Sequence, residues 1–528
     1  MAAIKPSRDS SPPAAIVAWL SSPSAYPHRP AEVERVETHI SCVFLAGSEV
    51  YKLKKPVRFD FLDFSTLPAR EHACREEVRL NRRLAPHVYL GVVPVTAQAG
   101  GAFALAGNGE IVDWLVHMRR LPEDRMLDAL YERGALRPEH IDQLSQLLAA
   151  FYAGAEPVAL SAAQYRGRCL AHVQGNLAEL MAVSHHVPRS VVERIHGFQL
   201  QLLQLQAELF ATRVQAGRIV EGHGDLRPEH ICLTDPIAIF DCIEFNEEFR
   251  QLDVADELAF LAAECDFLGA TWVGPLLLQR YQELSGDCPP QVLVDFYRAY
   301  RACVRAKVAA LRAGQVAGDA RERAVQDAAT HLALADKYVA PHLRPLMLVV
   351  GGLSGTGKSS LARELAKSLG AELLRTDIIR QELFGRSAQP GEVDAGMYQP
   401  AARQRVYQEM LSQAAAWHCQ RVSVVLDATF SKAADLLAAD AVVTDPHAQF
   451  LAIECQCAPE LVRQRILARQ QAGGDASQAT LAVFEQQRTR WEPWPDQIPA
   501  CRVDTQQSLE TQRDQVFGVL RRHLSDSR

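Results

Sequence analysis

The segment GLSGTGKS, from Gly352 to Ser359, constrains this chain more than any other because it matches the pattern GxxxxGK[ST]. It follows the unbroken apolar run LMLVVGG and precedes the helix-forming segment SLARELAKSL. A glycine-rich turn between a buried strand and a helix lets backbone N–H groups surround a phosphate, and the helix N-terminus adds its positive dipole end. We therefore expect the loop to hold a nucleotide phosphate through Gly352, Ser354, Gly355, Thr356, Gly357, Lys358, Ser359 and Ser360.

Three side chains give this loop its expected chemistry. Lys358 should reach the β- and γ-phosphates, and the Ser359 hydroxyl should ligate Mg²⁺. Asp427 ends the apolar strand in VVLDATF, where such folds place an acid near Mg²⁺. The next residue is Ala428 rather than a glutamate that could activate water, and no NKxD motif of GTPases stands near VVTDPHAQF. The pattern favours ATP and Mg²⁺ as cofactors and a hydroxyl group as the phosphoryl acceptor.

Alternating strands and helices predict the fold around the loop. At 528 residues the chain is too long for one hydrophobic core. After Pro341 and Pro345, the apolar strands AELLRTD, RVSVVLDATF and QFLAIECQC alternate with helical segments. We therefore expect residues 345–528 to form an α/β domain with a parallel, doubly wound sheet.

Four further residues in this domain are candidates for acceptor and phosphate binding. Asp377 ends the second predicted strand and could take the proton of the acceptor, while Arg380, one helical turn later, could hold an anionic group. The alternative is that Asp377 only caps the helix IIRQEL. Arg465 and Arg469 stand four residues apart, which suits a lid that clamps the transferring phosphate or, alternatively, a solvated helix face.

Most of residues 346–470 resembles the small P-loop kinases that include gluconate kinase, zeta toxin and the kinase of polynucleotide 5′ ends, a group of AAA family ATPase-like predicted kinases. The matching pieces are GLSGTGKS, TDIIR, LDATF and RQRILAR. TDIIR is most similar to the 5′-hydroxyl polynucleotide kinases, although it does not choose the acceptor. The resemblance implies phosphoryl transfer to a small molecule or to a nucleic-acid end.

A second phosphate-handling device lies about 130 residues earlier, in HGDLRPEHICL at residues 223–233. The segment IAIFDCIEF follows it. A phosphotransferase of this type needs one carboxylate to orient and deprotonate the acceptor hydroxyl and another to fix Mg²⁺ on the phosphates. Asp225 is the candidate for the first role and Asp241 for the second. His223 and Asp253 could brace the loop by hydrogen bonds.

Candidate charged partners for this motif lie earlier in the sequence. Strand alternation in EVYKLKK places Lys52 and Lys54 on one face, and we favour Lys54 as the residue that holds the α- and β-phosphates. In the following helix, Glu77 or its neighbour Glu76 could pair with that lysine. The alternative for each of these charges is a solvated face.

Residues 35 to about 310 resemble the aminoglycoside phosphotransferase family within the kinase-like fold, mainly through HGDLRPEH and IFDCIEF. The resemblance implies an α+β domain over residues 35–340, after an N-terminal extension of residues 1–34, with a β-rich lobe to about residue 120. His230 stands where the family has a metal-binding Asn, and it is a poorer ligand for Mg²⁺. There is also no Gly-rich loop. The domain could therefore be a competent kinase or a nucleotide-binding regulator.

Six acidic residues follow Asp241, namely Glu244, Glu247, Glu248, Asp253, Asp256 and Glu257. They could attract a cationic acceptor, but we favour an outer helix face for several of them. The net charge of −7 does not indicate a basic surface that would bind nucleic acid. No apolar run reaches the length of a membrane span, and the cysteines form no CxxC pair, so we expect a cytoplasmic protein with no membrane partner and no evident stable protein partner.

The sequence thus predicts two fused kinase domains that phosphorylate hydroxyl acceptors. Two alternatives remain. In one, the N-terminal domain is a pseudokinase that regulates a single active P-loop kinase. In the other, the chain is a repair kinase for nucleic-acid 5′-hydroxyl ends.

Overall fold

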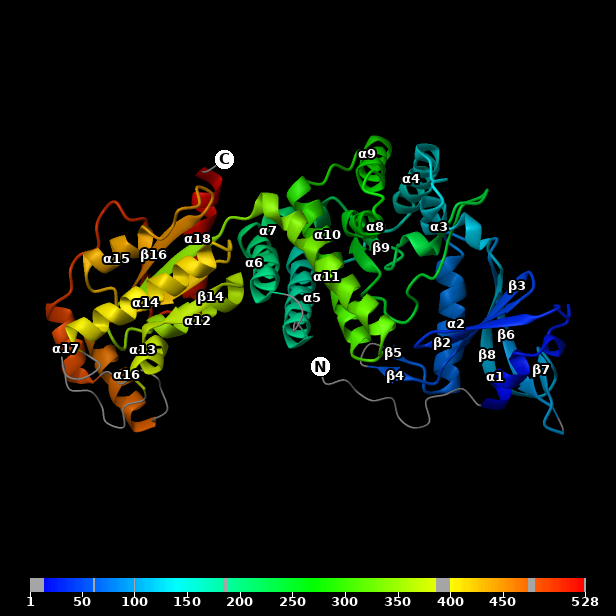
Figure 1. Cartoon of the computed structure of the whole chain (residues 1–528), viewed down its shortest axis with the longest axis horizontal. Coiled ribbons are helices and arrows are strands. Elements are labelled where there is room, and N and C mark those ends of the chain that lie inside the picture. The colour runs from blue at the N-terminus through cyan, green and yellow to red at the C-terminus, as the bar shows by residue number, and fades with distance from the viewer. Residues whose placement is uncertain are drawn as a thin grey trace. The chain divides into compact units, whose positions relative to one another are not determined.

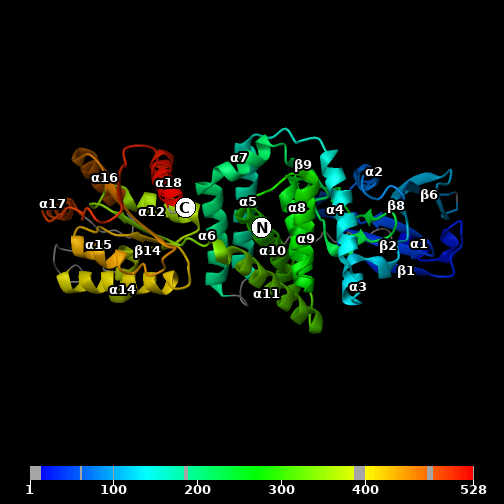
Figure 2. The same cartoon turned by 90° about the horizontal axis from the view of Figure 1, so that it is seen from above.

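The computed structural model describes residues 14–59, 62–98, 100–183, 188–385, 399–472 and 480–526 (Figures 1 and 2). The chain divides into two compact units, and each is discontinuous in sequence. The first unit comprises Met1–Ser161 and Thr212–Ala302, and the second comprises Ala162–Ala211 and Cys303–Arg528. The division expected at residues 340–345 marks the start of strand β13 (Leu346–Gly351), whereas the compact units divide the chain elsewhere.

The first unit begins with a six-stranded antiparallel sheet in the order β1-β2-β3-β8-β6-β7. Its strands are β1 (Val33–Glu37), β2 (Ser41–Ala46), β3 (Glu49–Lys54), β6 (Tyr89–Ala97), β7 (Phe103–Leu105) and β8 (Glu110–Arg119). Helix α2 (Leu67–Asn81) packs Cys74 and Val78 against one face of the sheet. Helix α1 (Ala14–Leu20) packs against the other face, so part of the expected N-terminal extension belongs to the core of this sheet.

Helices make up most of the rest of the first unit. They are α3 (Leu127–Glu132), α4 (Pro138–Ala153), α8 (Val254–Leu268), α9 (Val273–Ser285) and the first half of α10 (Gln291–Ala313). Two short antiparallel ribbons lie among them, β9 (Ile219–Glu221) with β12 (Gln251–Asp253), and β10 (Ile231–Cys232) with β11 (Ala238–Ile239). A further ribbon joins β4 (Arg58–Phe59) to β5 (Leu62–Asp63). The expected α+β arrangement, with a β-rich part followed by helices, is confirmed.

The expectation that several of the acidic residues lie on an outer helix face is wrong for α8. Residues 254–265 of this helix are buried throughout, including Asp256 and Glu257. Asp256 forms an ion pair with Arg301 at 2.7 Å, and Asp253 forms one with Arg213 at 2.8 Å. Burying a carboxylate is tolerable only when a cation or several hydrogen bonds compensate it, and Arg301 of α10 and Arg213 supply the cations here.

The second unit contains a five-stranded sheet in the order β14-β15-β13-β16-β17, and all its strand pairs are parallel. Besides β13, its strands are β14 (Glu372–Arg375), β15 (Val424–Asp427), β16 (Gln449–Gln456) and β17 (Ala500–Asp504). Helices α12 (Lys358–Leu369) and α18 (Leu509–Asp526) cover one face, and α13 (Thr376–Phe384), α14 (Pro400–His418) and α15 (Ala433–Asp440) cover the other (Figure 2). The predicted doubly wound α/β fold is confirmed.

Helices from the middle of the chain complete the second unit. They are α5 (Ala162–Val183), α6 (Arg189–Leu205), α11 (Asp319–Val339) and the second half of α10, and α7 (Ala207–Gln215) begins in this unit. Gln201 of α6 donates a hydrogen bond to Ser423 Oγ at 2.9 Å, just before β15. Gly197 of α6 lies so close to Gly370, at the end of α12, that a Cβ atom on Gly197 would stand 3.1 Å from the Gly370 carbonyl oxygen. No helix within the described ranges is long and apolar enough to cross a membrane.

Candidate active sites

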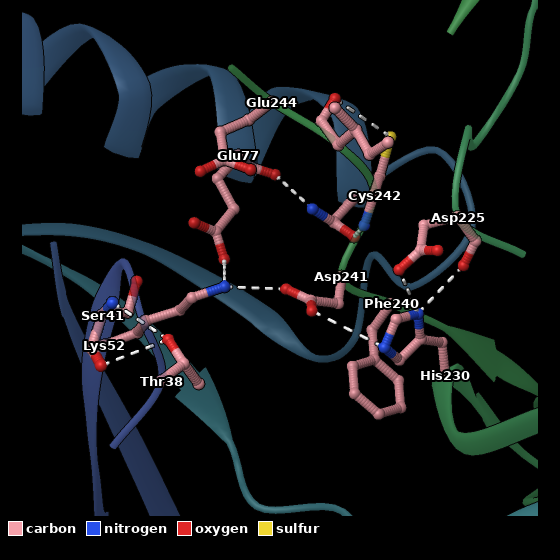
Figure 3. A network of polar contacts seen from close by, with 12 residues as sticks. Thr38, Ser41, Lys52, Glu77, Asp225, His230, Phe240, Asp241, Cys242 and Glu244 are labelled. Atoms are coloured by element: carbon pink, nitrogen blue, oxygen red, sulfur yellow. Dashed lines mark hydrogen bonds and ion pairs between the residues drawn. The ribbon is translucent and has the colours of Figure 1, made fainter. Parts of the chain in front are cut away.

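The site in the first unit is built around Lys52 on β3 (Figure 3). Its Nζ lies 2.9 Å from Glu77 Oε1 on α2 and 2.7 Å from Asp241 Oδ1. Burial alone would lower the pKa of Lys52, but Asp241 and Glu77 raise this pKa well above its ordinary value. Lys52 is therefore held as a cation between two carboxylates, in the lysine–glutamate arrangement that kinases use to grip phosphates.

Lys54, which we favoured from the sequence, occupies a different environment. Its side chain is fully buried, and Nζ contacts Glu77 Oε2 at 2.6 Å and a Glu244 oxygen. By contrast, 43% of the side chain of Asp241, the carboxylate that Lys52 contacts, is exposed. Only Lys52 contacts a group that a nucleotide can reach, so the structure favours Lys52 for phosphate binding and Lys54 for support of Glu77.

The turn between β1 and β2, residues 38–40, contains no glycine. It is closed by a hydrogen bond from the Thr38 backbone N–H to the Ser41 carbonyl at 2.9 Å. The Ser41 N–H donates in turn to Thr38 Oγ1 at 3.0 Å. A threonine side chain thus shapes this turn in the absence of glycines.

Glu257 of α8 braces the loop that carries Asp225. Its Oε1 accepts the backbone N–H groups of His223, at 2.8 Å, and Gly224, while Tyr152 donates to its Oε2 at 2.7 Å. The His223 ring bonds the Phe240 carbonyl at 2.9 Å. The bracing expected from Asp253 is not present in the structure, because Asp253 pairs with Arg213 and caps α8 instead.

Arg227 and His230 lie beside Asp225, and Figure 3 shows His230 there. Arg227 Nε lies 3.1 Å from Asp225 Oδ1. His230 Nδ1 bonds the Asp225 carbonyl at 2.9 Å, so Nδ1 carries a hydrogen and Nε2 can accept from Arg227 Nη2 at 3.1 Å. Burial would raise the pKa of Asp225, but His230 and Arg227 lower it below its usual value. Asp225 is therefore an anion at neutral pH, suited to orient a hydroxyl.

Asp241 and His230 define the expected metal side of the site. His230 Nε2 lies 3.7 Å from Asp241 Oδ2. Burial would raise the pKa of Asp241, but Lys52 and His230 lower it. The ionised carboxylates of Asp225 and Asp241 offer the hard oxygens that Mg²⁺ prefers, and Mg²⁺ keeps several water ligands. No cluster of three or more His, Cys, Asp or Glu residues suited to a metal occurs among the residues that the structure describes. The hydrogen bonds of His230 favour a role in orienting Asp225.

In the second unit, the loop Gly352–Ser359 leads from β13 into α12, as its sequence predicts. Gly355 and Gly357 adopt φ values of +83° and +91°, which favour glycine. A Cβ on Gly355 would stand 2.9 Å from side-chain atoms of α16 (Pro459–Ala472), and one on Gly357 would stand 3.3 Å from Arg465 Nη1. Thr356 Oγ1 donates to the Leu353 carbonyl at 2.7 Å. The loop thus has the bare backbone and fixed shape of a phosphate cradle.

Asp427 lies beside this loop because β15, which it ends, pairs with β13. Its Oδ2 accepts a hydrogen bond from Arg375 Nε at 3.0 Å. Its Oδ1 is buried and has no hydrogen-bond partner within the described part of the chain. A buried carboxylate oxygen left without a donor suits a cation, so Asp427 and Ser359 fit the Mg²⁺ that the P-loop fold implies.

Asp377 and Arg380 form an ion pair at 2.7 Å near the carboxyl end of β14. The residue that caps α13 is Arg375, so the alternative in which Asp377 is the helix cap is wrong. Arg465 donates to the Thr505 carbonyl at 2.9 Å beside the phosphate loop. Arg469 belongs to α16, but its side chain lies outside the described residues.

Three residues touch these sites in roles that the sequence analysis did not assign to them: Glu257 as a loop brace, Arg227 beside Asp225, and Arg375 beside Asp427. Arg227 and Arg375 each stand two residues from a selected aspartate, so sequence proximity was the available signal. Glu257 gave no such signal, because its role depends on where α8 packs.

Comparison with known proteins extends these findings. The model of the AAA domain family matches residues 347–494. Uncharacterized proteins of Mycobacterium tuberculosis and Mycobacterium bovis are 34% identical to this chain over 504 residues, which cover 92% of this chain and 95% of theirs. The second unit contains a P-loop kinase-like domain, a fold that supports ATP binding, typically with Mg²⁺, and ATP-dependent phosphoryl transfer.

Two solved structures with similarity to parts of the chain are a sugar kinase and a choline/ethanolamine kinase family protein. A sugar kinase from Janibacter sp. HTCC2649 is 18% identical and covers 34% of this chain and 94% of its own, with a TM-score of 0.28. A choline/ethanolamine kinase family protein from Mesorhizobium loti is 14% identical and covers 61% of this chain and 99% of its own, with a TM-score of 0.35.

Proposed function

The chain belongs to the family of these mycobacterial proteins, and we propose that it is a bifunctional ATP-dependent phosphotransferase with one site in each unit. Each site transfers the γ-phosphoryl group of ATP to a hydroxyl group. The acceptors are small molecules or, for the second unit, a nucleic-acid end.

One observation supports this proposal: in each unit a lysine or a glycine-rich loop lies beside a carboxylate suited to Mg²⁺. In the first unit Lys52 Nζ lies 2.7 Å from Asp241 Oδ1. In the second, the strand that ends at Asp427 pairs with the strand that leads into the loop Gly352–Ser359. Mg²⁺, when bound, would neutralise the charge that the phosphates carry during transfer.

In the first site, Lys52 holds the α- and β-phosphates and Asp241 faces the metal. Asp225 accepts a hydrogen bond from the acceptor hydroxyl and aligns it for attack on the γ-phosphorus. Because the low pKa of Asp225 makes it a weak base, positioning contributes more than proton abstraction before attack.

In the second site, the loop N–H groups and Lys358 would hold the β- and γ-phosphates, and Ser359 and Asp427 would hold Mg²⁺. Asp377 receives the proton of the acceptor, and Arg380 orients Asp377 through their ion pair. Arg465, fixed beside the loop by Thr505, stabilises charge on the transferring group.

The test supplies γ-labelled ATP, Mg²⁺ and a fractionated small-molecule extract to the wild type, Asp225→Ala and Lys358→Ala. Each variant should lose a different labelled product. Lys367→Ala is the matched control for Lys358→Ala, because Lys367 lies exposed on the same helix. A wild type that labels no acceptor would contradict the proposal.

A regulatory role for the first unit is the second candidate. The observation that favours it is that Arg227 Nε lies 3.1 Å and His230 Nδ1 3.5 Å from the Asp225 carboxylate, where a competent kinase needs that carboxylate available to the acceptor. In that case Asp225→Ala leaves total phosphoryl transfer unchanged, while Lys358→Ala abolishes it.

A third arm of the same experiment addresses the nucleic-acid end. It offers single-stranded and nicked oligonucleotides with 5′-hydroxyl ends as acceptors. Labelling that disappears in Lys358→Ala supports a repair kinase, and the absence of labelling on both substrates argues for a small-molecule acceptor.

A further inference from the structure

Arg375 is the last residue of β14 and stands directly beside Asp427, the last residue of β15, in the register of these parallel strands. Its Nε donates to Asp427 Oδ2 at 3.0 Å. The Arg375 side chain is 16% exposed and that of Asp427 only 4%, so the pair is screened from water far more than a surface ion pair.

The contact gives the two oxygens of the Asp427 carboxylate different environments. Oδ2 is held by Arg375, whereas Oδ1 is buried and has no partner among the residues described. A carboxylate fixed through one oxygen cannot rotate freely, so the other oxygen keeps its direction. A second contact, from Thr376 Oγ1 to the Asp427 carbonyl at 3.4 Å, ties the backbone of the same residue to the start of α13.

Within the described ranges, the side chain of Arg375 makes no other hydrogen bond or ion pair. Its backbone caps α13, but its side chain makes no capping hydrogen bond. A substitution that removes the guanidinium therefore leaves the helix start in place. What it removes is the donor that orients Asp427 and compensates its charge.

We propose that Arg375 is a positioning residue for metal binding: it orients Asp427 so that Oδ1 is presented to the Mg²⁺ of a nucleotide in the phosphate loop. This inference rests on the proposed ATP and Mg²⁺ binding of the second unit. Partners that orient a metal-binding carboxylate typically contribute about 10- to 100-fold to metal affinity.

The test measures binding of a fluorescent ADP analogue to the full chain over a series of Mg²⁺ concentrations. Lys358→Ala isolates the signal of the second unit, because it removes binding there. For Arg375→Met, the Mg²⁺ concentration for half-maximal binding should rise about 10-fold or more. Arg375→Lys keeps one donor and should give an intermediate value. In an Asp427→Asn background, Arg375→Met should cause no further change.

Arg421→Met is the matched control, because Arg421 Nε contacts Asp445 Oδ2 at the same 3.0 Å in the same unit, away from the loop. It should keep the Mg²⁺ dependence of the wild type. Thermal unfolding in EDTA checks that each variant is folded. If Arg375→Met is unfolded, the Mg²⁺ concentration for half-maximal binding of Arg375→Lys tests the proposal in its place.

An unchanged or lower Mg²⁺ requirement in Arg375→Met, with normal binding by the wild type, would overturn this inference and leave the proposed function intact. If the wild type itself fails to bind the nucleotide with Mg²⁺, both this inference and the proposed function of the second unit are overturned. The wild type alone shows this outcome, so no variant is needed to recognise it.

Discussion

The site of the first unit is assembled from side chains that stand far apart in the sequence, whereas the phosphate loop of the second is one continuous run of backbone. Lys52 and Asp241, which touch, are 189 positions apart. Gly352–Ser359, by contrast, forms its cradle within a single turn between a strand and a helix. The first site is held by charges that neutralise one another, and the second by the conformation of its glycines.

This difference has an energetic consequence. Removing one member of a buried charge network leaves its partners without compensation, so a substitution harms stability as well as function. A backbone cradle has no such partners, and changes at Lys358 should affect binding more than folding. Stability and activity should therefore be coupled in the first unit and separable in the second.

The largest effect is expected from Lys54→Met, which tests the dependence of the first site on mutual neutralisation. The change leaves Glu77 and Glu244 buried without the ammonium that contacts both. We expect the free energy of unfolding of the first unit to fall by about 3–5 kcal/mol. Urea unfolding measures this fall, and Lys55→Met is the control because its partner Glu37 is half exposed. A loss no greater than that of the control would contradict the comparison.

Lys52→Met separates the two lysines by function. It should reduce transfer of the γ-phosphoryl group by the first site about 10²- to 10³-fold, because a positioned charge at the phosphates is lost. The unfolding free energy should fall less than in Lys54→Met, since Glu77 keeps its contact with Lys54. The product that depends on Lys358 should be unaffected. Equal losses of activity in both lysine variants at equal stability would undo the assignment of Lys52.

The same contrast decides what could be predicted from the sequence. GLSGTGKS and the strand before it fix the phosphate loop locally, and the position of Asp427 at a strand end follows from the parallel sheet. The choice between Lys52 and Lys54 could not be made this way, because strand alternation places both on one face. The choice depends on which lysine contacts Asp241 and which contacts Glu244, and both acidic residues lie much later in the sequence.

Sequence patterns also could not predict which elements each helix packs against. Helices α5 and α6 fall within residues 35–340, which the sequence analysis assigned to the first domain, but they join the second unit. Likewise, the charges of α8 suggest an exposed face, and only its arginine partners and the loop it braces explain their burial.

Acidification tests a smaller effect that is specific to the second unit. Burial lowers the pKa of His196 on α6 to about 4, below the ordinary value of 6.5. Because the unfolded chain then binds the proton more readily, stability present above about pH 6.5 is lost as the pH falls toward 4. Each pKa unit is worth about 1.4 kcal/mol, so the loss reaches roughly 3 kcal/mol near pH 4. Hydrogen exchange of α6 should show a weaker pH dependence between pH 6.5 and 4 in His196→Gln, and equal dependence in both proteins would contradict this.

The smallest expected effect tests whether close backbone contact with α6 stabilises α12, the helix that follows the phosphate loop. Gly197→Ala would place a Cβ 3.1 Å from the Gly370 carbonyl oxygen, at the end of α12. Gly167 lies within helix α5 with nothing within 4 Å of such a Cβ, so Gly167→Ala is its matched control. The control should gain about 0.5–1 kcal/mol of stability from lower chain entropy, whereas Gly197→Ala should lose about 1 kcal/mol or more because the two backbones must separate. Thermal unfolding of both variants measures the difference. Equal gains would mean that α6 can shift away from Gly370 at little cost, and the second unit would then depend less on backbone packing than its contrast with the first unit requires.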